Sequence, residues 1–329
     1  MTRLLPFLLL ALLTPAPPAA AQGPTAKLIV LNKEDATLVT VDPETRQVLG
    51  RVPTGEGPHE VAVSADGRTA FVGNYGAQTP GSTLSVIDLV AMKELQRVDL
   101  TPLRRPHGVY VHGGAVYFTA ETNRIVARYD PASNKVDWLF GTGQAGTHMV
   151  WVNADGTKMI TCNIGSDSMS MLERGANPLA WNQTVVPVGK GPEGFDVSPD
   201  GKEVWAAHSR DGGVSVIDIE QKKVTATIDV QTKRSNRLKF TPDGKTALVS
   251  DLDAGELVVI DVASRTVTKR LPLGRMLEGI LVQPDGARAF VAVTGDNHIA
   301  VIDLKTFAVT GRIEPGRGPD GMAWVAARR

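Results

Sequence analysis

The sequence predicts an all-β protein built from a repeat of about 42 residues, and three observations lead to this prediction. An Asp-Gly pair between two short apolar runs begins at residues 66, 155, 200, 243 and 285, so the last three intervals are 45, 43 and 42 residues and the first, of 89, spans two repeats. The tripeptide Val-Ile-Asp begins at residues 86, 216, 259 and 301. No stretch beyond the N-terminal segment has the long 3.6-residue apolar period of an amphipathic helix. Four short strands in a repeat of this length are typical of a β-propeller blade.

Each repeat is expected to contain four strands separated by turns. In the fifth repeat the strands are EGFDVS, EVWAAH, VSVIDI and KKVTATIDV, all rich in the Val, Ile and Thr that strands prefer. The Asp-Gly pair predicts a type I′ hairpin turn between the first two strands, with positive φ at both central residues. Residues 112–114, His-Gly-Gly, replace Asp-Gly in the third repeat. A β-sandwich whose turns are evenly spaced by coincidence is the alternative. Seven copies of the repeat, matched at their turns and at the Val-Ile-Asp position, disfavour it.

The two ends of the chain complete each other. Residues 26–52 match only the second to fourth strands of a repeat, and residues 318–329 match only the first. We therefore predict a seven-bladed β-propeller with four antiparallel strands per blade, closed when the C-terminal strand joins the N-terminal blade. This single domain should cover residues 22–329. A closed ring has no free sheet edge, so we expect a monomer.

The first 21 residues are predicted to be a signal peptide. Arg3 precedes an apolar run at residues 4–13, and three alanines at 19–21 suit cleavage after Ala21. We therefore expect a periplasmic or secreted protein. No later stretch approaches the length of apolar residues needed for a membrane span. The single cysteine, Cys162, excludes an internal disulfide, and we expect it to be a small buried residue.

The repeat resembles that of a known family. GPHEVAVSADGRTAFVGN (57–74) and GPEGFDVSPDGKEVWAAHS (191–209) resemble the repeat of the YVTN-type seven-bladed β-propellers, and residues 232–251 match it more loosely. The resemblance covers essentially the whole mature chain, which is identified as a YncE-like member of the family. It implies the fold but no single function, because the family includes cell-surface proteins, periplasmic binding proteins and relatives of lactonases.

Polar residues are predicted to meet at one mouth of the central channel. The first strand of each blade lines the channel, and the residue at the start of this strand recurs seven positions before the Asp-Gly aspartate. Counted in this way or by local match, the first strands contribute His59, His107, His148, Glu193, Asn236, Glu278 and Asp320. The ends of the second strands return to the same mouth and add, among others, Asn74, Asn163 and His208. We predict these ten residues to form a ligand-binding surface. The two remaining histidines, His112 and His298, are expected at the surface.

Two interpretations of this mouth stay open. Polar residues at a wet channel opening can simply bind water. Alternatively, His59, His107, His148 and Glu193 offer nitrogen and oxygen ligands that suit a divalent transition metal better than calcium, although the sequence has no short metal-ligand spacing.

Three functions follow from these interpretations. The first is a binding or scaffold protein that captures a small molecule or a protein at the mouth and at its inserts, residues 77–83 and 174–183. The second insert carries an apolar tip, Pro178 to Trp181. This tip either anchors a partner or packs on the blade, and we favour packing on the blade.

The second function is a metal-dependent hydrolase or lyase. Lactonases and virginiamycin B lyase are similar propellers, and the resemblance implies His107 or His148 as general base, with Glu193 and Glu278 holding a metal. No motif beyond the blade repeat matches these enzymes, so we rank this function second.

The third function is DNA binding, through the basic segments 102–107 and 231–239. Lys and Arg together number 35, as do Asp and Glu, and this zero net charge disfavours nucleic acid as the main partner.

Overall fold

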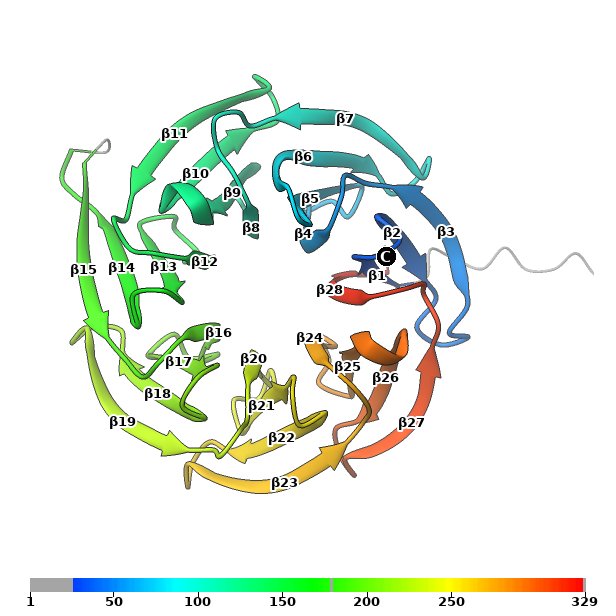
Figure 1. Cartoon of the computed structure of the whole chain (residues 1–329), viewed down its shortest axis with the longest axis vertical. Helices are drawn as coiled ribbons and strands as arrows, with labels where there is room; N and C mark the ends of the chain where they lie inside the picture. The colour runs from blue at the N-terminus through cyan, green and yellow to red at the C-terminus, as the bar shows by residue number, and fades with distance from the viewer. Residues whose placement is uncertain (1–25, 178–179, 328–329) are drawn as a thin grey trace, which may run out of the picture.

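The computed structural model describes residues 26–177 and 180–327 and has seven four-stranded sheets arranged around a central channel (Figure 1). The predicted seven-bladed propeller with antiparallel four-stranded blades is therefore confirmed. The expected signal peptide, residues 1–21, and Pro178 and Leu179 of the predicted apolar tip lie outside the described residues.

The strands follow one another from the channel to the outer rim in each blade. The first three contiguous blades are formed by β4 (Pro58–Val63), β5 (Thr69–Gly76), β6 (Pro80–Asp88) and β7 (Lys93–Asp99); β8 (Pro106–His112), β9 (Ala115–Ala120), β10 (Ile125–Asp130) and β11 (Lys135–Gly141); and β12 (Thr147–Val152), β13 (Lys158–Asn163), β14 (Ser168–Arg174) and β15 (Trp181–Pro187).

The next three are formed by β16 (Pro192–Val197), β17 (Glu203–His208), β18 (Gly213–Asp218) and β19 (Lys223–Asp229); β20 (Ser235–Phe240), β21 (Thr246–Asp251), β22 (Glu256–Asp261) and β23 (Thr266–Pro272); and β24 (Leu277–Val282), β25 (Arg288–Val293), β26 (His298–Asp303) and β27 (Ala308–Ile313). Two short 3-10 turns, η1 (Glu121–Asn123) and η2 (Thr294–Asp296), follow β9 and β25.

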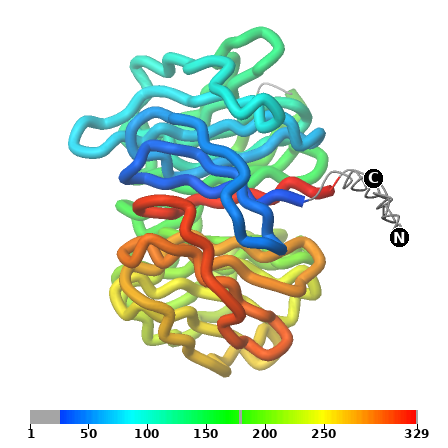
Figure 2. The backbone as a smooth tube through the Cα atoms, turned by 90° about the vertical axis from the view of Figure 1, so that its right-hand side faces the viewer, coloured from blue at the N-terminus to red at the C-terminus, as the bar shows by residue number. Residues whose placement is uncertain are grey.

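The seventh blade is shared between the two ends of the chain. Its strand order is β28 (Pro319–Val325), β1 (Lys27–Asn32), β2 (Thr37–Val41) and β3 (Val48–Pro53). The innermost strand β28 pairs antiparallel with β1, so the last strand fastens the first blade, as Figures 1 and 2 show. The predicted closure is present.

The Asp-Gly turns differ from the prediction. Only the glycine of each pair has positive φ, for example 66° at Gly67 and 71° at Gly201, whereas neither Asp66 nor Asp200 has positive φ. Each turn closes with a hydrogen bond from the glycine N–H to the carbonyl three residues earlier, as from Gly67 to Ser64 at 2.8 Å. The loops are therefore longer turns ending in a left-handed glycine, and the type I′ prediction was wrong.

The core lies between successive blades. Trp205 of β17 is fully buried and packs edge-on against Phe240 of β20 in the next blade, with ring centroids 5.2 Å apart. Cys162 is fully buried, as expected. Trp181 of β15 packs against Trp138 of β11 in the preceding blade, with centroids 5.5 Å apart, so this tryptophan packs on the propeller across a blade boundary. Among the described residues, no helix is long and apolar enough to cross a membrane.

Candidate functional site

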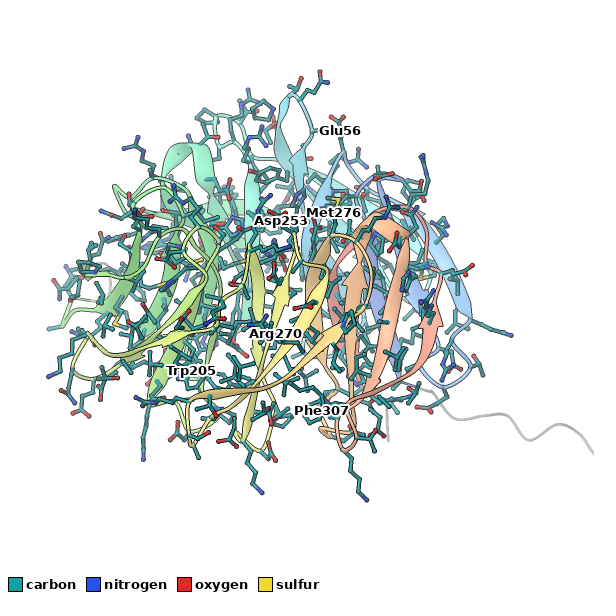
Figure 3. The ribbon with its side chains drawn as sticks, turned by 60° about the horizontal axis from the view of Figure 1, so that its bottom comes forward. Glu56, Trp205, Asp253, Arg270, Met276 and Phe307 are labelled. Carbon is teal, nitrogen blue, oxygen red and sulfur yellow. The ribbon has the colours of Figure 1, made fainter. Side chains whose placement is uncertain are left out.

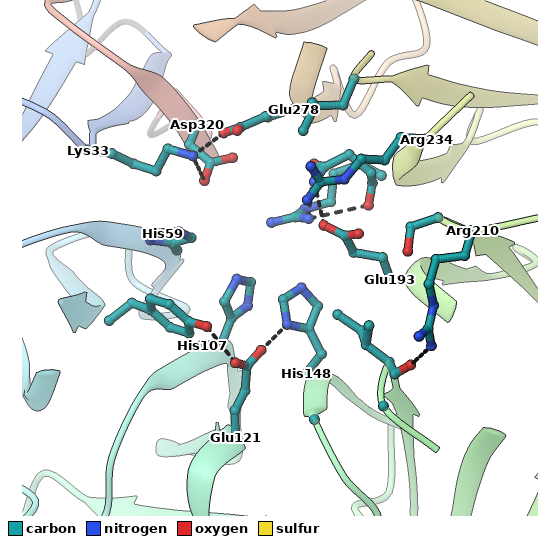
Figure 4. Close-up of a pocket in the computed structure, with 18 residues that line it drawn as sticks. Lys33, His59, His107, Glu121, His148, Glu193, Arg210, Arg234, Glu278 and Asp320 are labelled. Atoms are coloured by element: carbon teal, nitrogen blue, oxygen red, sulfur yellow. Dashed lines mark hydrogen bonds and ion pairs between the residues drawn. The ribbon is translucent and has the colours of Figure 1, made fainter. Parts of the chain in front are cut away.

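All seven first-strand residues predicted for the channel mouth line one cavity of about 660 Å³ (Figure 4). The cavity opens at the face that carries the loops before the innermost strands, where Glu56 and Met276 lie; Phe307 lies toward the opposite face (Figure 3). The residues that meet in the cavity are His59, His107, His148, Glu193, Asn236, Glu278 and Asp320.

A break in strand pairing directs these side chains into the cavity. In every blade the register between the two inner strands shifts at the mouth end, for example between Pro58 and Val61 and between Leu277 and Ile280. Each of the seven first-strand residues that line the cavity, called the hub residues below, lies at such a shift. β-Bulges of this kind re-aim side chains and are common beside functional sites.

Glycine lets the bulges pack around the narrow channel. Four blades have glycine directly after the hub residue, and a Cβ atom on Gly321 would come within 2.1 Å of the carbonyl oxygen of His59. Two blades have a charged residue at this position instead, namely Glu60 and Arg237. Their side chains consequently enter the channel.

The three residues predicted from the ends of the second strands do not line the cavity and support the blades instead. Asn74 accepts a hydrogen bond from the Gly55 N–H at 3.0 Å and donates to Ser85. Asn163 donates to Ser168 and Ser170, and His208 donates to Asp211 at 2.8 Å. Buried polar groups need such partners, so these side chains act inside their own blades.

The expected surface position of one histidine was also wrong. His298 is only 6% exposed, because it lies at the start of a third strand rather than in the turn. His112 is half-buried beside Tyr117.

One wall of the cavity holds a cluster of His107, Glu121 and His148. The Nδ1–H of His148 donates to Oε1 of Glu121, and the Tyr75 hydroxyl donates to Oε2 at 2.6 Å. The rings of His107 and His148 are 3.6 Å apart between centroids. Burial alone would raise the pKa of Glu121, but His148 and these hydrogen bonds hold it below its usual value. Glu121 is therefore ionised at neutral pH.

Two other histidine environments favour the neutral imidazole. Burial lowers the pKa of His107 well below its usual value. Burial also lowers the pKa of His59 to about 4, and Nδ1 of this ring is 2.9 Å from the carbonyl oxygen of Gly57.

The facing wall holds a second cluster, formed by Lys33, Glu278 and Asp320 (Figure 4). The ammonium of Lys33 contacts Glu278 and lies 3.5 Å from Asp320. Burial and the charge of Asp320 raise the pKa of Glu278 to about 7, while Lys33 opposes this rise. Burial would also raise the pKa of Asp320, but Lys33 and Arg237 hold it below its usual value. One carboxyl group on this wall can therefore exchange a proton near neutral pH.

A buried ion pair crosses the channel below these two clusters. Arg237 of β20 donates through Nε to Glu60 of β4 at 3.1 Å, and through Nη1 to the side-chain oxygen of Asn236 at 3.1 Å. Arg237 is 5% exposed. It also lines a second cavity of about 330 Å³, together with Glu60. Arg237 therefore contributes to the walls of both cavities.

A family model for a YNCE-like beta-propeller matches residues 1–328. The chain belongs to this family. No curated protein matches the sequence.

Solved structures with the same fold resemble this YNCE-like propeller at low sequence identity. The periplasmic gluconolactonase PpgL of Pseudomonas aeruginosa has a TM-score of 0.76 and 19% identity, covering 92% of this chain and 99% of its own. A candidate 6-phosphogluconolactonase of Bacteroides uniformis has a TM-score of 0.76 and 17% identity, covering 92% and 100%. Kuenenia stuttgartiensis hydrazine synthase has a TM-score of 0.70 and 19% identity, covering 80% and 88%. These similarities show the shared fold.

Several residues of the YNCE-like propeller's cavity were not predicted as site residues. They are Lys33, Tyr75, Glu121, Arg210, Arg234 and Arg237. Glu121 directly follows β9, the second strand of its blade, and this repeat position is the signal that places it at the mouth. Arg237 could have been found from the repeat, because it replaces the glycine that most blades have after the hub residue.

Proposed function

We propose that this YNCE-like propeller binds a small polar molecule in the mouth cavity and hydrolyses it, with a sugar-acid lactone as the substrate class. The observation that carries this proposal is the pair of facing clusters, His107–Glu121–His148 and Lys33–Glu278–Asp320, across a cavity of about 660 Å³. This volume is within the range of pockets that bind small molecules. Binding at the mouth is also the first function predicted from the sequence.

The two clusters provide the groups that lactone hydrolysis needs. Water adds to the ring carbonyl carbon, the bond from that carbon to the ring oxygen breaks, and the ring oxygen gains a proton to give a hydroxy acid. In this proposal the cluster of His107, Glu121 and His148 supplies the imidazole and carboxylate groups that activate the attacking water. On the facing wall, Glu278 has a pKa near that needed to deliver a proton, and the Lys33 ammonium favours developing negative charge.

Similarity of fold supports this choice of substrate class. One similar structure is a periplasmic gluconolactonase, and another is a candidate 6-phosphogluconolactonase. The specific support comes from the cavity of this chain, because fold alone does not define activity.

We propose that this hydrolysis takes place outside the cytoplasm. The support is the N-terminal segment, with Arg3, the apolar run at 4–13 and the alanines at 19–21.

The test is to incubate the purified protein with glucono-δ-lactone, its 6-phosphate and an acyl homoserine lactone, and to follow acid release above the spontaneous rate. We expect turnover of at least one sugar lactone, strongly reduced in Glu121→Gln and Glu278→Gln. His112→Gln is the matched control, because His112 ends β8 outside the cavity lining, and it should retain full activity. Binding measured by calorimetry without turnover would support a binding protein instead. The proposal is overturned if the protein neither binds nor hydrolyses any of these lactones.

A further inference from the structure

The cluster on one wall of the cavity brings together three groups that ligate metals. One ring nitrogen each from His107 and His148 and one carboxylate oxygen of Glu121 lie within 4.8 Å of one another. They come from two adjacent blades: His107 from β8, Glu121 from the η1 turn after β9, and His148 from β12. The sequence separates these residues by 14 and 27 positions, so no short ligand spacing could have revealed the cluster.

Two ring nitrogens of this cluster lack partners. Nδ1 of His107 and Nε2 of His148 are buried without a hydrogen bond, although the two residues are only 2% and 5% exposed. Buried polar atoms are nearly always paired, and leaving one unpaired costs free energy. An ion in the cluster would pair Nδ1 of His107, and at His148 it would replace the proton between Nδ1 and Oε1 of Glu121.

The surroundings of the carboxylate are those of a metal ligand. The Tyr75 hydroxyl holds the second oxygen of Glu121 at 2.6 Å, and such hydrogen bonds orient metal-ligating carboxylates. The cavity beside the cluster leaves room for water or substrate at a further coordination position.

We infer that His107, Glu121 and His148 bind a divalent transition metal ion, with Zn²⁺ as the ion whose ligand preferences fit best. Two histidines and one glutamate with an open position are a recurrent catalytic zinc set, whereas calcium and magnesium prefer oxygen ligands alone. The ion would lower the pKa of its bound water to about 7. That catalytic consequence rests on the proposed function, whereas ion binding does not.

This set differs from the one predicted from the sequence, which had His59 and Glu193 in place of Glu121. Nδ1 of His59 is engaged with the carbonyl oxygen of Gly57 at 2.9 Å. Neither His59 nor Glu193 belongs to the group of ligand atoms that lie together.

The experiment titrates the chelator-treated mature protein with zinc chloride by calorimetry and with cobalt chloride by visible absorption. We expect one ion per chain. The bound cobalt should absorb visible light intensely, as cobalt ions of low coordination number do. His107→Ala, Glu121→Gln and His148→Ala should each weaken zinc binding by at least about 100-fold, and Tyr75→Phe by about 10- to 100-fold. His59→Ala and Glu193→Gln are matched controls from the same cavity and should change affinity by less than about threefold.

Two results would overturn the inference: no stoichiometric binding by the wild-type protein, or equal losses in the control variants. Glu121→Gln and Tyr75→Phe barely change side-chain volume, so they keep the test valid if an alanine variant fails to fold. Thermal melting checks the folding of each variant. If zinc binds but the loaded protein hydrolyses no lactone, the proposed function fails and the metal site stands. If the wild-type protein binds no zinc but hydrolyses a lactone, the metal site fails and the proposed function stands.

Discussion

The ion pair that crosses the channel should make a large contribution to stability that depends on both partners. Glu60→Gln would leave the Arg237 guanidinium buried without its counter-charge, since the two side chains are only 14% and 7% exposed. Removing one partner of a buried ion pair typically costs about 3–5 kcal/mol. Arg237 keeps its hydrogen bonds to Asn236, so we expect a loss near the lower end, about 3 kcal/mol in the free energy of unfolding.

Replacing both partners should cost much less than the sum of the single changes. The cavity on the inner side of the pair is lined by apolar side chains such as Phe195 and Ile280, so the double variant Glu60→Leu/Arg237→Met can pack there. The assay is urea unfolding of the wild type, Glu60→Gln, Glu60→Leu, Arg237→Met and the double variant, and additivity is judged from the last three. Glu94→Gln is the control, because its partner Arg97 is 42% exposed and a surface pair contributes less than about 1 kcal/mol. Single losses as small as that of the control, or additive losses, would refute the reasoning.

Three further predictions test other parts of the molecule. Because burial lowers the pKa of His59 to about 4, the native state binds fewer protons than the unfolded state from about pH 4 to 6.5. The free energy of unfolding should therefore fall on acidification through this window, by up to about 3 kcal/mol for this residue. The urea midpoint of His59→Gln should fall less than that of the wild type over the same pH range. Asn163→Ala should lower the melting temperature, because it removes hydrogen bonds to Ser168 and Ser170, yet leave zinc affinity unchanged; a change in zinc affinity with no effect on melting would contradict its structural role. N-terminal sequencing of the exported protein should begin at Gln22, and light scattering should give a monomer at all concentrations; an uncleaved chain or a concentration-dependent dimer would reject these predictions.

The sequence predicted the blades well because each blade is a local unit. Strand periodicity and turn residues act within about 42 residues, and the repeat supplies seven copies of the same signal. The same regularity placed His59, His107 and Glu278 at the mouth, since equivalent positions of the blades face the channel. It failed at Asn74 and His208, where a polar residue at a strand end satisfies its own blade.

The clusters could not be predicted because they join residues from different blades. Glu121 and His148 meet only when two blades are packed side by side, and Lys33 reaches Glu278 only after the ring has closed. Glu60 and Arg237 lie 177 positions apart and meet across the channel. Repeat position identifies which residues face the hub, but the direction and length of each side chain decide which of them touch.

The measurement that tests the central claim most directly is the rate of glucono-δ-lactone hydrolysis by zinc-loaded protein as a function of pH. The account predicts saturable turnover above the spontaneous rate, with kcat/KM reduced by at least about 100-fold in Glu121→Gln and in Glu278→Gln and unchanged in His112→Gln. The Glu278→Gln variant should also lose the pH dependence that a group titrating at about pH 7 imposes on the wild type. Hydrolysis equal to the spontaneous rate, or turnover that both cavity variants retain, would contradict the claim that the facing clusters form an active site.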